Sequence, residues 1–364
     1  MTAFIISAKR SAIVPRGGAF ATLSIEDIGA PVGLACLTAA GIAPDQVDEI
    51  IVSNALGAGG NPARRIALAM GLPEAVAGLT TDRQCAGGLD ALLLARALVA
   101  SGQANVVLAG GVESYSRRPL RYATDPQGGP PMPYDEAPFT PWPDRNPTMA
   151  QAASELAQTL GITREMQDLF AVESHAKARA AAMTEQSEIL PLFDIRTDPF
   201  TRNLTATAAA RAKPITGTIT AANAAVAADG AAFCLVVCAK IAAQAGRSIR
   251  IAAAATLGAA PDQPGLAPVA AIKRVLAQAK VKPGALHLSE IMEAYAVQAI
   301  ACIHGAELDP ARVNPGGGSL ARGHPIGASG AVLAVRLWHD LQAGHGLAAI
   351  AAAGGIGSAL LLHA

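Results

Sequence analysis

The sequence is poor in charged and aromatic residues, and neither sign of charge prevails. Charged residues make up 15% and aromatic residues 4% of the 364 residues, and 28 basic side chains balance 28 acidic ones. A chain without net charge lacks the basic surface that attracts nucleic acids or anionic membranes. We therefore expect no nucleic-acid partner and no membrane partner.

Export signals and long apolar runs are also missing. The N-terminal stretch MTAFIISAKRSAIVPRGG has neither the basic start nor the small-residue cleavage site of a signal peptide. No apolar run approaches the ~20 residues that span a bilayer. We therefore expect a cytoplasmic protein, in which cysteines remain reduced thiols.

The cysteines and histidines show no metal-binding spacing, so we predict no metal site. Within FCLVVCAK, Cys234 and Cys238 are spaced so that both lie on one face of a strand. Four of the five cysteines are predicted to fill the core. These four are Cys36, Cys234, Cys238 and Cys302.

Small apolar residues dominate what is present. Hydrophobic residues make up 51% of the chain, and there are 36 glycines. Small side chains let helices and strands approach closely, which favours a layered α/β fold. Strand and helix patterns alternate over residues 1–115 and again from about residue 225. Between them lies a zone rich in proline and glycine, followed by a helical segment near 148–183.

The C-terminal part of the chain resembles the N-terminal part. GGLDALLLARALVASGQANVVLAGG (87–111) and SGAVLAVRLWHDLQAGHGLAAIAAAGG (329–355) each contain an apolar helix between glycines, then a buried strand ending in Gly-Gly. This pattern suggests a duplicated βαβ-type half. The predicted division is an N-terminal half formed by 1–115 plus 225–247, an inserted loop domain over 116–224, and a C-terminal half over 248–364.

Cys85 precedes the first of these helices, in TTDRQCAGGLDALLLARAL. The N-terminus of a helix offers unpaired N–H groups and the positive end of the dipole. Both favour a thiolate, and such settings lower a cysteine pKa to ~3.5–7.5. We therefore expect Cys85 to be a nucleophile with a lowered pKa. A small residue chosen for packing would fit this local pattern equally well.

His324 lies in the second glycine-rich segment, VNPGGGSLARGHPIGASGA. Pro325 and Gly327 restrict the turn, and a helix is predicted to start near Ser329. A histidine held in this way could act as the general base for a thiol, although a structural loop histidine is the alternative. The terminal GIGSA is not a dinucleotide fingerprint, because too little chain follows it for the rest of that motif.

Several of these segments together resemble the thiolase family. They are VSNALGAGGNPARRIAL, DRQCAGGLDA, AGGVESYSRRP, GTITAANAAVAADGAA, MEAYAVQ, NPGGGSLARGHPIGASGA and AAAGGIGSA, in the order of that family. The resemblance implies a five-layered α/β/α/β/α core built from two similar βαβαβ halves, with an inserted loop domain. It also implies a homodimer or homotetramer. Acyl-CoA would be the substrate, with coenzyme A as substrate or product and no permanently bound cofactor.

The resemblance also implies roles for particular residues. Cys85 matches the nucleophile that carries the acyl group, and His324 matches the histidine that activates it. The backbone N–H groups of Cys85 and Ala353 match an oxyanion hole for the acyl-enzyme. Met149 matches a residue that lines the acyl pocket, and Ala225 replaces a serine that contacts the pantetheine.

Two departures from the family concern carbon–carbon bond chemistry. Thiolases read Asn-Glu-Ala-Phe-Ala where this chain reads Met292-Glu-Ala-Tyr-Ala, and that asparagine orients a water beside the enolate oxygen. Thiolases also have a second cysteine, which moves the α-proton, where this chain has Ala351. In addition, Arg322 takes a position that is apolar in the family.

We therefore predict a thiolase-like acyl-CoA acyltransferase of fatty-acid metabolism with altered catalytic residues. It would cleave 3-ketoacyl-CoA or condense acetyl-CoA. One alternative is a thioesterase or acyl carrier that uses only the Cys85 half-reaction. Another is a non-catalytic thiolase-like subunit that binds acyl-CoA or a partner.

Overall fold

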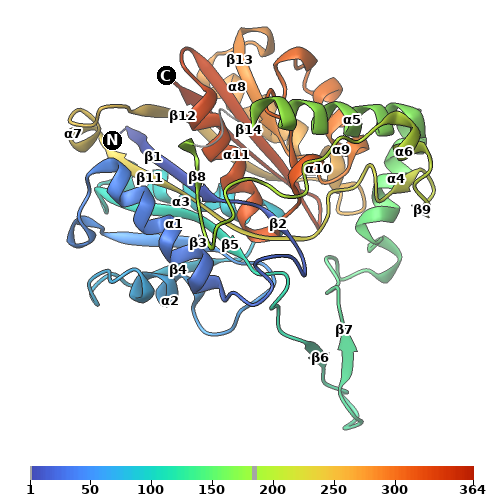
Figure 1. The fold of residues 1–364 in the computed structure, drawn as a ribbon, viewed down its shortest axis with the longest axis horizontal. Coiled ribbons are helices and arrows are strands. Elements are labelled where there is room, and N and C mark those ends of the chain that lie inside the picture. The colour runs from blue at the N-terminus through green and yellow to red at the C-terminus, as the bar shows by residue number, and fades with distance from the viewer. Residues whose placement is uncertain (1, 183–186) are drawn as a thin grey trace.

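Strands and helices alternate along most of the chain, as the sequence predicts (Figure 1). The computed structural model describes residues 2–182 and 187–364. Its strands are β1 (Ala3–Ser11), β2 (Val14–Pro15), β3 (Glu49–Ser53), β4 (Leu79–Thr81), β5 (Val106–Glu113), β6 (Arg121–Ala123), β7 (Met132–Tyr134), β8 (Ile189–Leu190), β9 (Pro214–Thr216), β10 (Ile219–Thr220), β11 (Ala228–Cys238), β12 (Ile249–Gly258), β13 (Leu286–Ile291), β14 (His345–Ala352) and β15 (Ile356–His363). Its α-helices are α1 (Ile25–Ala40), α2 (Pro62–Ala69), α3 (Gly87–Ser101), α4 (Met149–Leu160), α5 (Arg164–Ala181), α6 (Ala206–Ala210), α7 (Ala239–Ala242), α8 (Ala267–Ala279), α9 (Ala296–Gly305), α10 (Ser319–Arg322) and α11 (Ile326–Asp340).

The large sheet consists of two halves with the same pairing pattern. Its strand order is β13-β14-β15-β12-β1-β11-β5-β3-β4. In the N-terminal half, β3 runs parallel to β4 and β5, and β5 pairs antiparallel with β11. In the C-terminal half, β13 runs parallel to β14, and β15 pairs antiparallel with both β14 and β12. This repeated pattern confirms the predicted duplication. A short antiparallel pairing between β1 and β12 joins the two halves.

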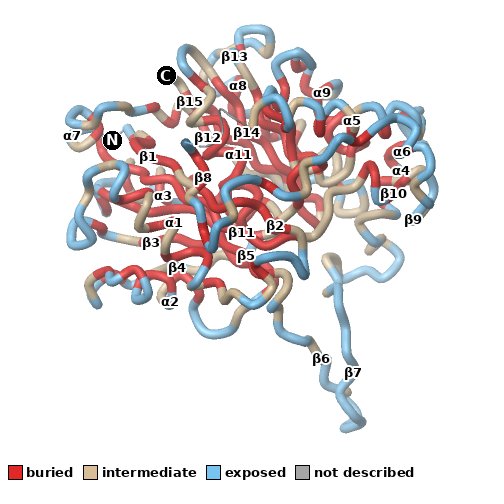
Figure 2. The backbone as a smooth tube through the Cα atoms, in the orientation of Figure 1, coloured by how far each residue is buried: buried red, intermediate tan, exposed pale blue. Residues whose placement is uncertain are grey.

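Helices and half-sheets form five layers, and three clusters of buried apolar side chains fill the space between them. One cluster lies between α1 and α2 and the outer face of the N-terminal half-sheet. The second surrounds α3 and α11 and reaches both half-sheets. The third lies between the C-terminal half-sheet and α8 and α9. The order α/β/α/β/α is the predicted fold class, and the buried residues gather in the sheet and the central helices (Figure 2).

Strand β11 shows why the middle of the sheet lacks an alternating polar pattern. Cys234 and Cys238 face the central cluster, whereas Phe233 and Leu235 face the outer cluster. Every residue of β11 is buried, because helices cover both faces of the sheet. The prediction that Cys234 and Cys238 fill the core is confirmed, and Cys36 and Cys302 are buried as well.

The central helices α3 and α11 cross at glycines. A Cβ atom on Gly88 of α3 would lie 2.8 Å from the backbone N of Ala331 and 2.8 Å from the carbonyl O of Gly327. Conversely, a Cβ atom on Gly330 of α11 would overlap the backbone of Leu89. The two glycines therefore allow the two backbones to touch, and the N-terminal ends of both helices lie close together.

The inserted segment carries α4, α5 and α6, which pack near α9 and α10 (Figure 1). The helical segment predicted near 148–183 consists of two helices, because Gly161 ends α4 with φ of 65° and Thr163 caps the start of α5. Residue 183 itself lies outside the described residues. The hairpin of β6 and β7 extends away from the layers and is exposed to solvent (Figures 1 and 2).

One stretch is long and apolar enough to cross a membrane when judged by length and composition alone. This stretch, Gln84–Ser101, includes α3. In the structure it belongs to the central layer, where α3 packs against α11 and β5. Its apolar character is explained by burial against protein on several sides.

We expect Gly330→Ala to destabilise the fold. An alanine favours a helix interior by about 1 kcal/mol over glycine, but overpacking costs about 1–3 kcal/mol, and here the obstacle is backbone that cannot rotate away. The free energy of unfolding, measured with urea, should therefore fall. Gly246→Ala is the control, because a Cβ atom there meets nothing within 4 Å. Equal stability of the two variants would contradict the close crossing.

Candidate active site

A cavity opens where the central helices meet the inserted segment. Its volume is about 1290 Å³, including the space open to solvent. Six of the predicted site residues line it: Cys85, Met149, Ala225, His324, Ala351 and Ala353. Residues far apart in the sequence therefore share one cavity.

Cys85 and His324 form a hydrogen-bonded pair in this cavity. The distance between Cys85 Sγ and His324 Nε2 is 3.2 Å. On the other side of the ring, His324 Nδ1 lies 2.6 Å from Ser329 Oγ. The Ser329 hydroxyl donates to the Pro325 carbonyl at 3.0 Å, so it accepts the Nδ1–H hydrogen of His324. The Nε2 lone pair therefore faces the thiol, as a general base requires.

A sharp turn presents Cys85 to the cavity. The preceding residue, Gln84, has a left-handed backbone with φ of 49°, and the Asp82 carboxylate accepts a hydrogen bond from its backbone N–H at 2.8 Å. Asp90 on α3 accepts hydrogen bonds from Arg83 at 2.6 Å and from Thr256 on β12 at 2.6 Å. Asp90 thus connects the turn to β12 of the C-terminal half-sheet.

The expected low pKa of Cys85 is wrong. Burial raises the pKa of the Cys85 thiol to about 12, and the negative charges of Glu113 and Asp82 act in the same direction. The backbone N–H groups of Cys85 and Ala353 lower this pKa, but they do not overcome burial. Burial also lowers the pKa of His324 to about 4. At neutral pH the resting pair is therefore a neutral thiol and a neutral imidazole.

The N–H groups expected to form an oxyanion hole are near the sulfur. The same backbone N–H groups that lower the Cys85 pKa belong to Cys85 and Ala353. Ala353 follows β14 and precedes two glycines in a left-handed conformation, Gly354 and Gly355, so the chain turns tightly there. Both N–H groups therefore act on the Cys85 sulfur.

One extended segment pairs with the backbone at His324. The His324 N–H donates to the Val226 carbonyl at 2.7 Å, and Ala227 forms a parallel bridge with His324. The adjacent Ala225 donates its N–H to the Ala294 carbonyl at 2.9 Å. The segment after the inserted zone thus connects the His324 loop to the loop that follows β13.

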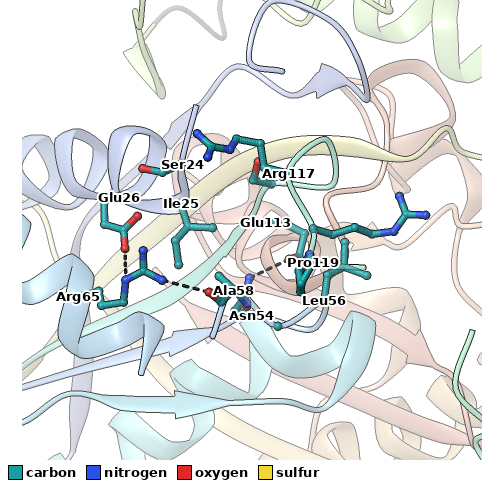
Figure 3. A pocket seen from close by; sticks show the side chains of 13 residues that line it. Ser24, Ile25, Glu26, Asn54, Leu56, Ala58, Arg65, Glu113, Arg117 and Pro119 are labelled. Atoms are coloured by element: carbon teal, nitrogen blue, oxygen red, sulfur yellow. Dashed lines mark hydrogen bonds and ion pairs between the residues drawn. The ribbon is translucent and has the colours of Figure 1, made fainter. Parts of the chain in front are cut away.

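Glu113 holds the first turn of α11. Its Oε2 atom accepts hydrogen bonds from the N–H groups of Gly327 and Ala55, each at 3.0 Å, and its Oε1 atom accepts one from Asn54 at 2.7 Å. Burial raises the pKa of Glu113 to about 7. Figure 3 shows Asn54 and Glu113 in the wall of a second pocket, of about 520 Å³ including open space. Glu113 therefore connects this wall to the His324 loop.

Arg322 departs from the family pattern and has a structural partner. It is buried, it donates to the Gly316 carbonyl at 2.6 Å, and it forms an ion pair with Asp198 at 3.1 Å. Asp198 also pairs with Arg10, which in turn pairs with Glu188. This buried network fixes the glycine-rich segment that precedes His324.

The two positions that differ from the family lie in different surroundings. Ala351 lines the cavity, so a methyl group lies there. Met292 is fully buried, and it is not among the described residues that line the cavity. Its Sδ atom accepts a hydrogen bond from Ser319 Oγ at 3.3 Å. The Met292 side chain belongs to the central apolar cluster.

Comparison with known proteins decides the family. Residues 3–240 match the thiolase N-terminal domain, and residues 247–364 match the thiolase C-terminal domain. The chain belongs to the thiolase family. Among the described residues of this thiolase, no three His, Cys, Asp or Glu side chains are grouped as a metal site would require.

Relatives span the whole chain. The putative acetyl-CoA C-acetyltransferase YhfS of Bacillus subtilis is 38% identical, covering 100% of this thiolase and 99% of the relative. The acetyl-CoA acetyltransferase of Cupriavidus necator is 38% identical, with coverage of 99% and 98%. The protein is therefore a thiolase-type acyltransferase.

Solved structures agree with this assignment. The Acat5 thiolase of Ascaris suum, in complex with coenzyme A, has a TM-score of 0.93 at 30% identity and covers 100% of both chains. The Bacillus anthracis acetyl-CoA acetyltransferase has a TM-score of 0.92 at 32% identity, covering 100% of this thiolase and 98% of that chain. The five-layered fold is thus that of thiolases.

Sequence reasoning did not single out two of the residues that orient the site. Ser329 was considered only as a helix start, although its position five residues after His324 allows it to reach back to the ring. Glu113 ends a buried strand, where a carboxylate is unusual, and that signal could have identified it. The partners of Glu113 could not be found from sequence, because they come from distant loops.

Ser329→Ala should slow the reaction of Cys85 with acyl-CoA about 5-fold. The variant removes the acceptor that fixes the His324 tautomer, and one hydrogen bond contributes about 1 kcal/mol. The rate of acyl addition to Cys85 can be followed by intact-protein mass spectrometry. Ser319→Ala is the control, because that hydroxyl contacts Met292 Sδ instead. The same rate in both variants would argue against tautomer control.

The thiol of Cys85 should remain protonated from about pH 6 to pH 9, because its pKa is raised to about 12 rather than lowered. The measurement is thiolate ultraviolet absorbance of the wild type minus that of Cys85→Ser. We expect no difference to develop over this range. An ionisation near neutral pH would show that the helix N-terminus outweighs burial.

Proposed function

We propose that this thiolase forms an acyl-enzyme on Cys85 and exchanges the acyl group with coenzyme A. The observation that carries the proposal is the 3.2 Å contact between Cys85 Sγ and His324 Nε2 inside the cavity. The names of the relatives and the coenzyme A complex of the Ascaris suum thiolase support coenzyme A thioesters as substrates.

The reaction begins with proton transfer during attack. His324 Nε2 takes the thiol proton as Cys85 Sγ bonds to the carbonyl carbon, because the resting pair is neutral. The N–H groups of Cys85 and Ala353 then stabilise the oxyanion. The leaving group departs with a proton. Coenzyme A subsequently attacks the acyl-enzyme, and its proton returns through His324 to Cys85.

The finer form of the proposal includes 3-ketoacyl-CoA thiolysis or acetyl-CoA condensation. We further propose that the protein acts in the cytoplasm as a homodimer or homotetramer. Coenzyme A enters and leaves as substrate or product. Met149 and Ala225 line the cavity and would contact the acyl group and the pantetheine arm, respectively.

A second candidate is a thioesterase or acyl carrier, and the methyl group of Ala351 in the cavity favours it. Losing an oxyanion donor costs about 10²–10³ in rate, and losing a placed acid or base costs about 10²–10⁴. Acyl addition to Cys85 requires neither missing group. Continued release of free coenzyme A from acyl-CoA, without an acyl acceptor, would support hydrolysis over transfer.

Mixing the protein with acetyl-CoA and longer acyl-CoAs should add one acyl mass, and Cys85→Ser should abolish it. Cys302→Ser is the matched control, because Cys302 contacts the cavity residue Gln298 but does not contact His324. Peptide mapping locates the adduct. An adduct that persists in Cys85→Ser, or none at any chain length in the wild type, would refute the acyl-enzyme.

A further inference from the structure

The cavity contains a further group that can carry a proton, the half-buried Tyr295. It immediately precedes α9 and lines the cavity together with Cys85, His324 and Ala351. Where the family has phenylalanine, the tyrosine adds a hydroxyl group.

Tyr295 and His324 both pair with the same extended segment, residues 224–227. Tyr295 forms an antiparallel bridge with Ala224, and His324 forms a parallel bridge with Ala227. Extended chain rises ~3.3 Å per residue, so these two anchor points lie ~10 Å apart. A tyrosine side chain can cover much of that distance. A substrate between them can contact both side chains.

The hydroxyl of Tyr295 has no hydrogen-bond partner among the described residues. Its oxygen is not among the fully buried polar atoms, so it remains accessible. Burial raises the pKa of Tyr295 to about 12, and the charges of Glu136, Cys85 and Tyr115 act in the same direction. The phenol is therefore protonated at neutral pH. It also lies within electrostatic reach of Cys85.

The other ionisable side chains around the cavity have different surroundings. The Tyr115 ring is covered by the guanidinium groups of Arg16 and Arg118. Asp135 is exposed and pairs with Arg118. Glu136 is exposed to solvent as well. Apart from Cys85 and His324, Tyr295 is therefore the cavity group best placed to exchange a proton with a bound substrate.

We propose that Tyr295 is a second acid–base residue of this site. It exchanges a proton with the carbon next to the thioester carbonyl. This role rests on the proposed acyl-enzyme at Cys85. The methyl group of Ala351 leaves space for substrate, and the hydroxyl of Tyr295 supplies the proton.

The protons balance through one cleavage cycle. Cys85 Sγ bonds to C3 of a 3-ketoacyl-CoA, and its proton passes to His324. The C2–C3 bond breaks with its electron pair going to C2 and the thioester oxygen, and Tyr295 Oη–H protonates C2. The phenolate recovers a proton from the His324 imidazolium through cavity water. Coenzyme A then takes the acyl group from Cys85, passing its own proton to Cys85 through His324.

The test is exchange of acetyl-CoA methyl hydrogens for deuterium in D₂O, followed by mass spectrometry. This exchange runs the protonation step backwards: the neutral His324 imidazole takes the phenol proton through cavity water, and the Tyr295 phenolate then removes a methyl hydrogen. The wild type should exchange them, and Tyr295→Phe should exchange them about 10²–10⁴-fold more slowly. Tyr295→Phe should still form the acyl adduct on Cys85, which shows that the site is folded. Tyr122→Phe, at an exposed position on β6, is the control.

The outcomes separate this role from the proposed function. Exchange lost in Tyr295→Phe and kept in Tyr122→Phe supports the acid–base role. Equal exchange in Tyr295→Phe and the wild type overturns it. A wild type that acylates Cys85 without exchange also overturns it, and leaves the acyl-enzyme intact. Absence of any acyl adduct overturns the acyl-enzyme and the Tyr295 role together.

Discussion

The active site depends on the crossing of α3 and α11. Cys85 precedes one helix and His324 precedes the other, so the distance between their side chains is set by how closely the helix ends approach. Gly88 and Gly330 allow the two backbones to touch, because a Cβ atom at either position would meet main-chain atoms of the other helix. Both half-sheets then pack around this pair, and their loops complete the cavity.

Burial controls the electrostatics of the site. A helix N-terminus favours a thiolate, but its effect falls off within the first turn and is modest at ~0.3–1 kcal/mol near a surface. Removing a thiol from water has the larger effect here, since the pKa of Cys85 rises to about 12. The Cys85 thiol and the His324 imidazole are therefore both uncharged in the resting protein. In the proposed reaction, charge appears only when a substrate carbonyl arrives beside the N–H groups of Cys85 and Ala353.

The residues that depart from the family pattern change few positions, and the contacts around Cys85 and His324 are kept. Met292 and Ala351 alter two positions, whereas the Cys85–His324 contact, the Ser329 hydroxyl and the Glu113 contacts keep the geometry of acyl transfer. Arg322, which is also atypical, forms part of a buried ion network. These residues are sufficient for the proposed acyl transfer at the carbonyl. The Tyr295 hydroxyl is available for proton transfer at the neighbouring carbon.

Periodic apolar patterns and ordered motifs are local signals, so the layered fold, the duplication and the pairing of Cys85 with His324 could be predicted from the sequence. The pKa direction at Cys85 required the three-dimensional structure, since burial depends on residues from both halves. The same holds for the burial of Met292 outside the cavity lining and for the contact between Glu113 and Gly327. Such contacts join loops far apart in the chain, and no local pattern encodes which loops will meet.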